Sequence, residues 1–212
     1  MKSTAYKLIE LFLLFVLFPI TLALPYAIGL KMGLGILGFV YILWVMARVE
    51  NIRFQIPKQL PWRTFWKRTL IIFLIIALLT ILFVWWQAPQ HLFYVPFQHP
   101  LLFFFILFFY SILSVWPQEI LYRTFFFKRY GVFFNSTYLL VFVNATLFSL
   151  AHLFFRNTLV IVLTFLGGIL FGLTFLKYKS TTLVTIEHAI YGNWLFTVGM
   201  GQMLGFPGME TS

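Results

Sequence analysis

The sequence predicts an all-α fold, a polytopic transmembrane helical bundle of about seven spans that forms a single domain over residues 1–212. First, 62% of the residues are hydrophobic and only 9% are charged, whereas a soluble domain averages about a quarter charged residues. Second, the apolar residues gather in stretches near the length of about 20 residues that crosses the ~30 Å hydrocarbon core of a bilayer. Third, no linker or low-complexity tract divides the chain.

Seven apolar segments are candidates for membrane spans. Pro19 and Pro25 predict a bend in the first segment, which a membrane helix can tolerate. The second segment is short, and Gly33, Gly35 and Gly38 predict a loosely wound or closely packed helix there. The seven segments cover residues 8–30, 33–47, 69–86, 101–116, 137–155, 159–176 and 181–200.

The distribution of positive charge predicts the orientation. The formal net charge is +10, and ten of the fifteen Lys and Arg residues lie at 2–7, 48–68 and 177–179, beside apolar segments. Because basic loops stay on the cytoplasmic side, we expect the amino terminus and the 48–68 loop inside and the 87–99 loop, which has no Lys or Arg, outside. We expect an integral membrane protein, located in a bacterial plasma membrane. No nucleic-acid-binding motif accompanies the charge, so no nucleic-acid partner is expected.

The fourth segment combines a predicted bend with polar residues. Its helical pattern runs from Leu101 to Tyr130, about 45 Å at 1.5 Å per residue, which exceeds the hydrocarbon core. Pro117 removes an amide donor from this helix and immediately precedes Gln118 and Glu119. We therefore expect a polar pocket that opens beside the bend.

Glu119 and Arg123 form the first polar cluster. They are four residues apart, so on a helix they share a face and can pair. One interpretation is a structural ion pair that neutralises two costly charges. In the other, Arg123 extends to the cytoplasmic surface and leaves Glu119 free for chemistry.

The fifth segment places Asn144, Phe148 and His152 on one helical face, because they recur every four residues. Such a face is expected of a helix that lines a cavity. A lone His in an apolar helix is, however, more often a hydrogen-bonded packing residue than a catalyst.

The seventh segment contains the third cluster, Glu187, His188 and Asn193. Successive helical residues lie ~100° apart, so Glu187 and His188 point in different directions. His188 and Asn193 are about 140° apart on a straight helix, although Gly192 could permit a distortion. We favour the interpretation of Glu187 as a charge at the cytoplasmic side, near the basic residues of 177–179.

Ionisable groups inside a membrane are costly, at least ~2.5–3.5 kcal/mol at a helix centre, and therefore mark function. The three clusters predict one buried site at which Glu119, His152 and His188 meet. A carboxylate with two imidazoles can activate water by general-base catalysis or hold a metal that lowers the pKa of bound water. The chain has no Cys and no Asp, so the metal ligands would be His152, His188 and Glu119. Zinc and a metal-free reaction both stay open.

In this order, the clusters resemble the motifs of the CAAX-protease and bacteriocin-processing (CPBP, or Abi) family of intramembrane proteases. That family has two Glu followed after three residues by Arg, then Phe-x-x-x-His, then His followed four residues later by Asn or Asp. A glycine-rich stretch at 167–172 is similar to the family's glycine-rich helix. The matching residues here are Gln118, Glu119 and Arg123; Phe148 and His152; and His188 and Asn193.

The resemblance implies an intramembrane endopeptidase that cleaves a membrane-associated peptide or protein, by metalloprotease or glutamate chemistry. It implies that Glu119 and His152 activate the attacking water, that His188 and Asn193 stabilise the oxyanion, and that Arg123 fixes Glu119.

Two positions depart from the family pattern. Gln118 stands where the first Glu is expected, and Gly192 stands where Asn or Asp is expected, with Asn193 one residue late. An alternative is therefore a catalytically inactive family member that acts as a membrane scaffold or bacteriocin-immunity protein. A transporter with a proton relay is a further alternative, although the halves of the chain show no repeat.

Overall fold

The computed structural model describes residues 1, 3–52 and 59–204. Every regular element within these ranges is helical, which confirms the predicted all-α class. Lys2, Arg53 and Lys58, three of the basic residues used to predict the orientation, lie outside the described residues.

Within the described residues, six helices are long and apolar enough to cross a membrane, as a polytopic membrane protein requires. The seventh predicted segment also forms a helix, α11 (Thr181–Val198), but it is not one of the six. Glu187, His188 and Asn193 make it more polar than the others. The six spans are Thr4–Leu22, Ile28–Arg48, Trp62–Gln87, Pro100–Phe133, Thr137–Phe155 and Thr158–Tyr178.

The chain divides into two compact units. The first unit combines residues 1–56 with residues 117–181, and the second combines residues 57–116 with residues 182–212. Each unit is described by itself below. A single transmembrane domain over residues 1–212 stays a prediction.

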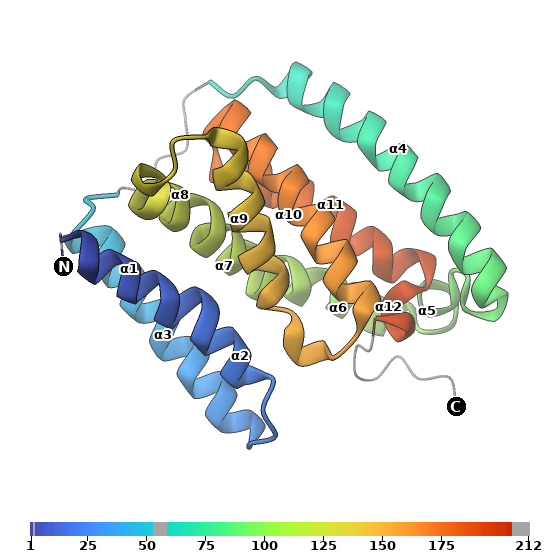
Figure 1. Cartoon of the computed structure of the whole chain (residues 1–212). Coiled ribbons are helices and arrows are strands. Elements are labelled where there is room, and N and C mark those ends of the chain that lie inside the picture. The colour runs from blue at the N-terminus through green and yellow to red at the C-terminus, as the bar shows by residue number, and fades with distance from the viewer. Residues whose placement is uncertain (2, 53–58, 205–212) are drawn as a thin grey trace. The chain divides into compact units, whose positions relative to one another are not determined.

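The first unit begins with two helical stretches that lie side by side (Figure 1, blue). The hydroxyl of Tyr41 connects them, because it donates a hydrogen bond to Glu10 and lies 3.0 Å from the hydroxyl of Tyr6. The first stretch comprises α1 (Thr4–Phe12), the π-helical segment η1 (Leu13–Leu17) and α2 (Phe18–Leu22), and the second is α3 (Ile28–Arg48).

The two prolines of the first stretch have different effects. Pro19 has no amide hydrogen and so interrupts the helical ladder, and the chain is π-helical immediately before it, over η1. Pro25 lies in the turn after Leu22. The predicted first segment, 8–30, was therefore wrong at its end, because the helix stops at Leu22 and the next one begins at Ile28.

The second span also differs from the prediction. Helix α3 is 21 residues long rather than short, and its α-helical pattern is unbroken. A β-carbon added to Gly33, Gly35 or Gly38 would meet nothing within 4 Å among the described residues. The predicted loose winding or close packing at these glycines was therefore wrong.

In the rest of the first unit, helices α9 and α10 pack along each other (Figure 1). A β-carbon added to Gly168 of α10 would lie 2.8 Å from the α-carbon of Ala145 in α9, so glycine permits this close approach of two backbones. Ser136 and Asn157 cap the two helices by accepting hydrogen bonds from their first turns. The elements here are α7 (Trp116–Glu119), η4 (Ile120–Phe125), α8 (Phe126–Tyr130), η5 (Gly131–Phe133), α9 (Thr137–Leu150), η6 (Leu153–Phe155) and α10 (Thr158–Tyr178).

A buried ion cluster joins the two parts of the first unit. Arg129 of α8 is fully buried and pairs with Glu10 of α1 and, at 2.6 Å, with Glu50, which follows α3. Tyr130 donates to Glu10 at 2.9 Å, and the amine of Lys7 lies 3.6 Å from Glu50. The cluster compensates charges that would be costly to bury singly.

In the second unit, Trp194 of α11 connects this helix to α4. Its indole nitrogen donates to the hydroxyl of Thr80 in α4 at 2.8 Å, and its ring packs edge-on against Phe73. At the end of α11 the chain turns at Gly199, whose φ is +101° and where a β-carbon would lie 1.9 Å from the carbonyl oxygen of His91, so only glycine fits. The elements are α4 (Trp62–Gln87), η2 (Pro89–His91), α5 (Tyr94–Gln98), α6 (Pro100–Phe109), η3 (Tyr110–Val115), α11 (Thr181–Val198) and α12 (Met200–Met203).

The fourth span is irregular around Pro117. Two π-helical segments, η3 (Tyr110–Val115) and η4 (Ile120–Phe125), lie on either side of α7, so the hydrogen-bond pattern departs from α where Pro117 lacks its donor. The candidate span covers Pro100–Phe133. The helical pattern predicted from Leu101 to Tyr130 is therefore confirmed, whereas the predicted end of the span at residue 116 was too early. Such π segments are frequent at functional sites.

Candidate functional site

The first motif forms a buried ion pair. The Nε of Arg123 lies 3.3 Å from a carboxylate oxygen of Glu119, and both side chains are fully buried. The i,i+4 pairing predicted from the spacing is confirmed. The alternative in which Arg123 extends to the surface was wrong, because its exposed fraction is 0%.

Arg123 has further partners on helices α9 and α10. Its guanidinium donates to the side-chain oxygen of Asn144 at 2.9 Å and lies over the ring of Phe148, 4.9 Å from the centroid. Asn144 in turn donates to the carbonyl of Tyr122 at 2.8 Å. The ring of Phe171 lies on the guanidinium as well, at 5.8 Å. Aromatic faces attract such a cation by cation–π interactions, so the motif arginine is held by more than its carboxylate.

His152 lies in the turn just beyond the end of α9. Its Nδ1 is 2.8 Å from the carbonyl oxygen of Phe148, and its ring packs edge-on against that of Phe148 at 4.9 Å. A carbonyl oxygen only accepts, so Nδ1 must carry the hydrogen. The neutral ring then has its lone pair on Nε2, where it can accept a proton or bind a metal.

Phe148 therefore links the first two motifs within the first unit. Its ring contacts the guanidinium of Arg123 on the one hand and the imidazole of His152 on the other. Asn144 and Phe148 are both buried, whereas His152 lies beyond the end of α9. The cavity expected along this face stays a prediction. Sequence reasoning did not identify Phe171 as a contact of Arg123. Its position within the glycine-rich stretch was a signal that could have found it.

Glu187 has a buried, ion-paired environment. Its carboxylate is fully buried and lies 3.0 Å from the guanidinium of Arg68 in α4. Tyr191 donates to it as well, at 3.1 Å. Sequence reasoning did not predict this buried ion pair of the second unit, and the expected position of Glu187 at the cytoplasmic side, near the basic residues of 177–179, stays a prediction.

His188 and Asn193 contact two consecutive residues at the start of η3. The Nε2 of His188 lies 3.4 Å from the hydroxyl of Tyr110, and the Asn193 amide donates to the hydroxyl of Ser111 at 3.0 Å. Sequence reasoning missed both partners. Their signal was a polar Tyr-Ser pair that interrupts the apolar run from Leu101 to Phe109.

The predicted site residues thus divide between the two units. Glu119, Arg123 and His152 belong to the first, and His188 and Asn193 belong to the second. In the described part of either unit, no three His, Cys, Asp or Glu side chains are grouped to hold a metal ion. A common chamber for the five residues, and a metal bound by Glu119, His152 and His188, stay predictions.

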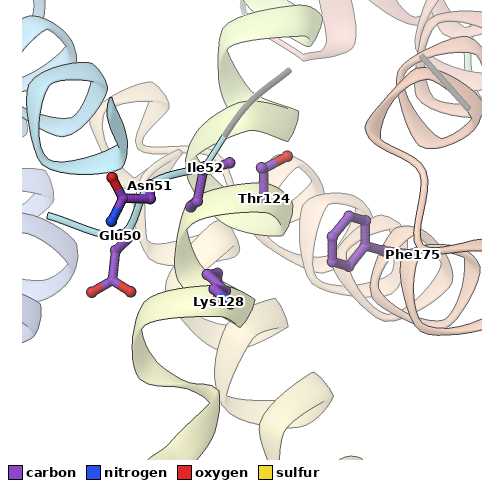
Figure 2. A pocket seen from close by; sticks show the side chains of 6 residues that line it. All are labelled: Glu50, Asn51, Ile52, Thr124, Lys128 and Phe175. Carbon is purple, nitrogen blue, oxygen red and sulfur yellow. The ribbon is translucent and has the colours of Figure 1, made fainter. Parts of the chain in front are cut away.

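A pocket of about 330 Å³ lies elsewhere in the first unit. Figure 2 shows Thr124 and Lys128 on one helix, with Phe175 of α10 on one side and residues 50–52, which follow α3, on the other. None of the predicted catalytic residues lines it. Thr124 is the nearest in sequence, directly after Arg123.

The spans and buried charges define a polytopic integral membrane protein with ionisable groups enclosed within apolar helices. Residues 99–195, just under half of the chain, match the family model of the type II CAAX prenyl endopeptidase Rce1-like proteins. This match covers all three motifs and confirms the resemblance inferred from them. No curated protein and no solved structure matches the chain.

Proposed function

We propose that the protein is an intramembrane endopeptidase, which hydrolyses a peptide bond in a membrane-associated peptide or protein. The observation that carries this proposal is the match of residues 99–195 to an endopeptidase family, over the stretch that contains a fully buried Glu119 held by Arg123. We further propose that it works in a bacterial plasma membrane with its amino terminus in the cytoplasm.

In the proposed reaction, the carboxylate of Glu119, assisted by the Nε2 of His152, takes one proton from the attacking water, whose oxygen bonds to the scissile carbonyl carbon. The same proton then passes to the leaving amine nitrogen as the C–N bond breaks. The hydrogen bond from Nδ1 of His152 to the Phe148 carbonyl supports this role, because it leaves Nε2 as the acceptor. Arg123 acts as a positioning residue, since its contacts with Asn144 and Phe148 fix the guanidinium that pairs with Glu119.

His188 and Asn193 would donate hydrogen bonds to the oxyanion that develops on the scissile carbonyl. The hydroxyl of Ser111 donates to the carbonyl of Leu107, so it accepts from the Asn193 amide and sets its orientation. A carboxamide nitrogen carries two hydrogens, and the bond to Ser111 requires only one. The second is suited to the oxyanion.

Metal dependence is a separate part of the proposal. A zinc ion bound by Glu119, His152 and His188 would lower the pKa of its bound water and polarise the carbonyl. Neither unit alone provides three such ligands among its described residues, so the steps above use only the side chains. Cleavage that is lost with a chelator and restored by zinc, with about one zinc per chain, would establish the metal reaction. Cleavage by metal-free protein would establish the metal-free reaction.

The test is cleavage of a peptide library by the purified full chain in liposomes. Glu119→Gln and His152→Ala should abolish cleavage while leaving membrane insertion intact. Glu10→Gln is the matched control, because it also neutralises a buried, ion-paired carboxylate and should retain cleavage per folded molecule. Persistent cleavage in both site variants would end the assignment.

Gln118 supports a second candidate, the catalytically inactive scaffold or immunity protein, because glutamine cannot accept a proton as the expected glutamate would. Gln118→Glu separates the two candidates. A gain of cleavage in a chain that is otherwise silent would identify an inactive relative, whereas an active enzyme should be unchanged or slowed.

A further inference from the structure

Gly192 leaves room for the side chain of Tyr110. A β-carbon added to Gly192 would lie 2.1 Å from the hydroxyl oxygen of Tyr110 and 2.6 Å from two of its ring carbons. These are the rigid end of an aromatic ring rather than a flexible chain. With Tyr110 in place, glycine is therefore the residue that fits at position 192.

The same hydroxyl lies beside His188. It is 3.4 Å from Nε2, and the two rings are edge to face with centroids 6.3 Å apart. Position 192 is where the resemblance places the Asn or Asp of the third motif. A polar group thus still lies next to the motif histidine here, but it comes from η3 rather than from α11.

Packing holds Tyr110 in this position. Its ring lies edge-on to Phe196, one turn beyond Gly192, with centroids 5.0 Å apart. It also packs against the buried cluster of Val95 and Phe196, together with Phe103 and Ile106. Few other rotamers are open to a ring enclosed in this way, so the hydroxyl is directed at His188.

We propose that Tyr110 is the positioning residue of His188, and that its hydroxyl replaces the side chain that Gly192 lacks. A hydroxyl both donates and accepts, so it can orient the imidazole in either tautomer. The role in turnover rests on the proposed peptidase function, whereas the pairing of Tyr110 with His188 can be tested without it.

The first experiment removes only the hydroxyl. Tyr110→Phe keeps the ring against Phe196 and Gly192, and kcat for peptide cleavage should fall about 10–100-fold, as for other residues that orient a catalytic group, with KM changed less than about twofold. Tyr191→Phe is the matched control, because it removes a buried hydroxyl from α11 that contacts Glu187 rather than His188 and should leave kcat unchanged. An unchanged kcat in Tyr110→Phe would overturn the proposal.

The second experiment exchanges the two positions. Tyr110→Ala empties the space that a side chain at 192 needs and should lower kcat at least as far as Tyr110→Phe. In the Tyr110→Ala background, Gly192→Asn should raise kcat about tenfold, because the asparagine side chain would again place a polar group beside His188. A double variant no faster than Tyr110→Ala would overturn the replacement of one side chain by the other.

A third readout separates this inference from the proposed function. The chain has four His, so nitrogen NMR of ¹⁵N-histidine-labelled protein can be assigned with a His188→Gln variant. Tyr110→Phe should shift the Nε2 signal of His188, and Tyr191→Phe should not. A wild-type chain that cleaves nothing would refute the peptidase function, and an unmoved His188 signal would refute the pairing.

Discussion

Arg123 donates a hydrogen bond of 2.9 Å to the side-chain oxygen of Asn144, and both side chains are fully buried. This bond connects the first-motif helix to α9, at whose end His152 lies. Asn144→Ala would remove the acceptor and also release the carbonyl of Tyr122. A buried polar group left unpaired costs about 1–3 kcal/mol, so the free energy of unfolding should fall by this amount.

Thermal unfolding in detergent measures this loss, and cleavage should weaken with it, because Arg123 orients Glu119. Thr146→Ala provides the control on the same helix, since Thr146 is exposed and its hydroxyl donates to the carbonyl of Phe142 within α9. If the two variants unfold at the same temperature, Asn144 does not join the two helices energetically.

Contacts between residues close in sequence could be predicted, whereas contacts between residues far apart in sequence could not. Six of the seven predicted spans followed from hydropathy, and the Glu119–Arg123 pair followed from helical spacing. By contrast, Arg68 and Glu187 are 119 residues apart, and no periodicity relates them. Sequence reasoning therefore did not identify Arg68 as the partner of Glu187.

The contacts of Gly168 and Gly35 predict opposite effects for the same substitution. In Gly168→Ala the new methyl group would meet the backbone of Ala145 at 2.8 Å, and overpacking of this kind costs about 1–3 kcal/mol. In Gly35→Ala the methyl group meets nothing within 4 Å, and alanine favours the helix by about 1 kcal/mol. Unfolding temperatures should fall for the first variant and hold or rise for the second. A tolerated Gly168→Ala would contradict the close packing of α9 and α10.

The absence of Cys allows the predicted orientation to be tested with single cysteines. Gln90 and Lys179 are both exposed, and the positive-inside distribution predicts opposite sides for them. Gln90→Cys should react with a membrane-impermeant thiol reagent added to intact cells, whereas Lys179→Cys should react only after permeabilisation. The unmodified chain reports background labelling. The reverse pattern would show that the amino terminus faces outward.

Arg129 should contribute more to stability than any exposed cation of the chain. Its guanidinium is fully buried against Glu10 and Glu50, and Arg129→Met would leave both carboxylates without that partner. Breaking a buried pair on one side costs about 3–5 kcal/mol, so the free energy of unfolding in detergent should fall by this amount. Because buried pairs are little screened by salt, the loss should persist at high ionic strength.

Lys128→Met removes the same charge from the neighbouring exposed position and should change stability by less than about 0.5 kcal/mol, as surface substitutions do. Equal losses in the two variants would mean that the buried cluster does not stabilise the contact between α8 and α1.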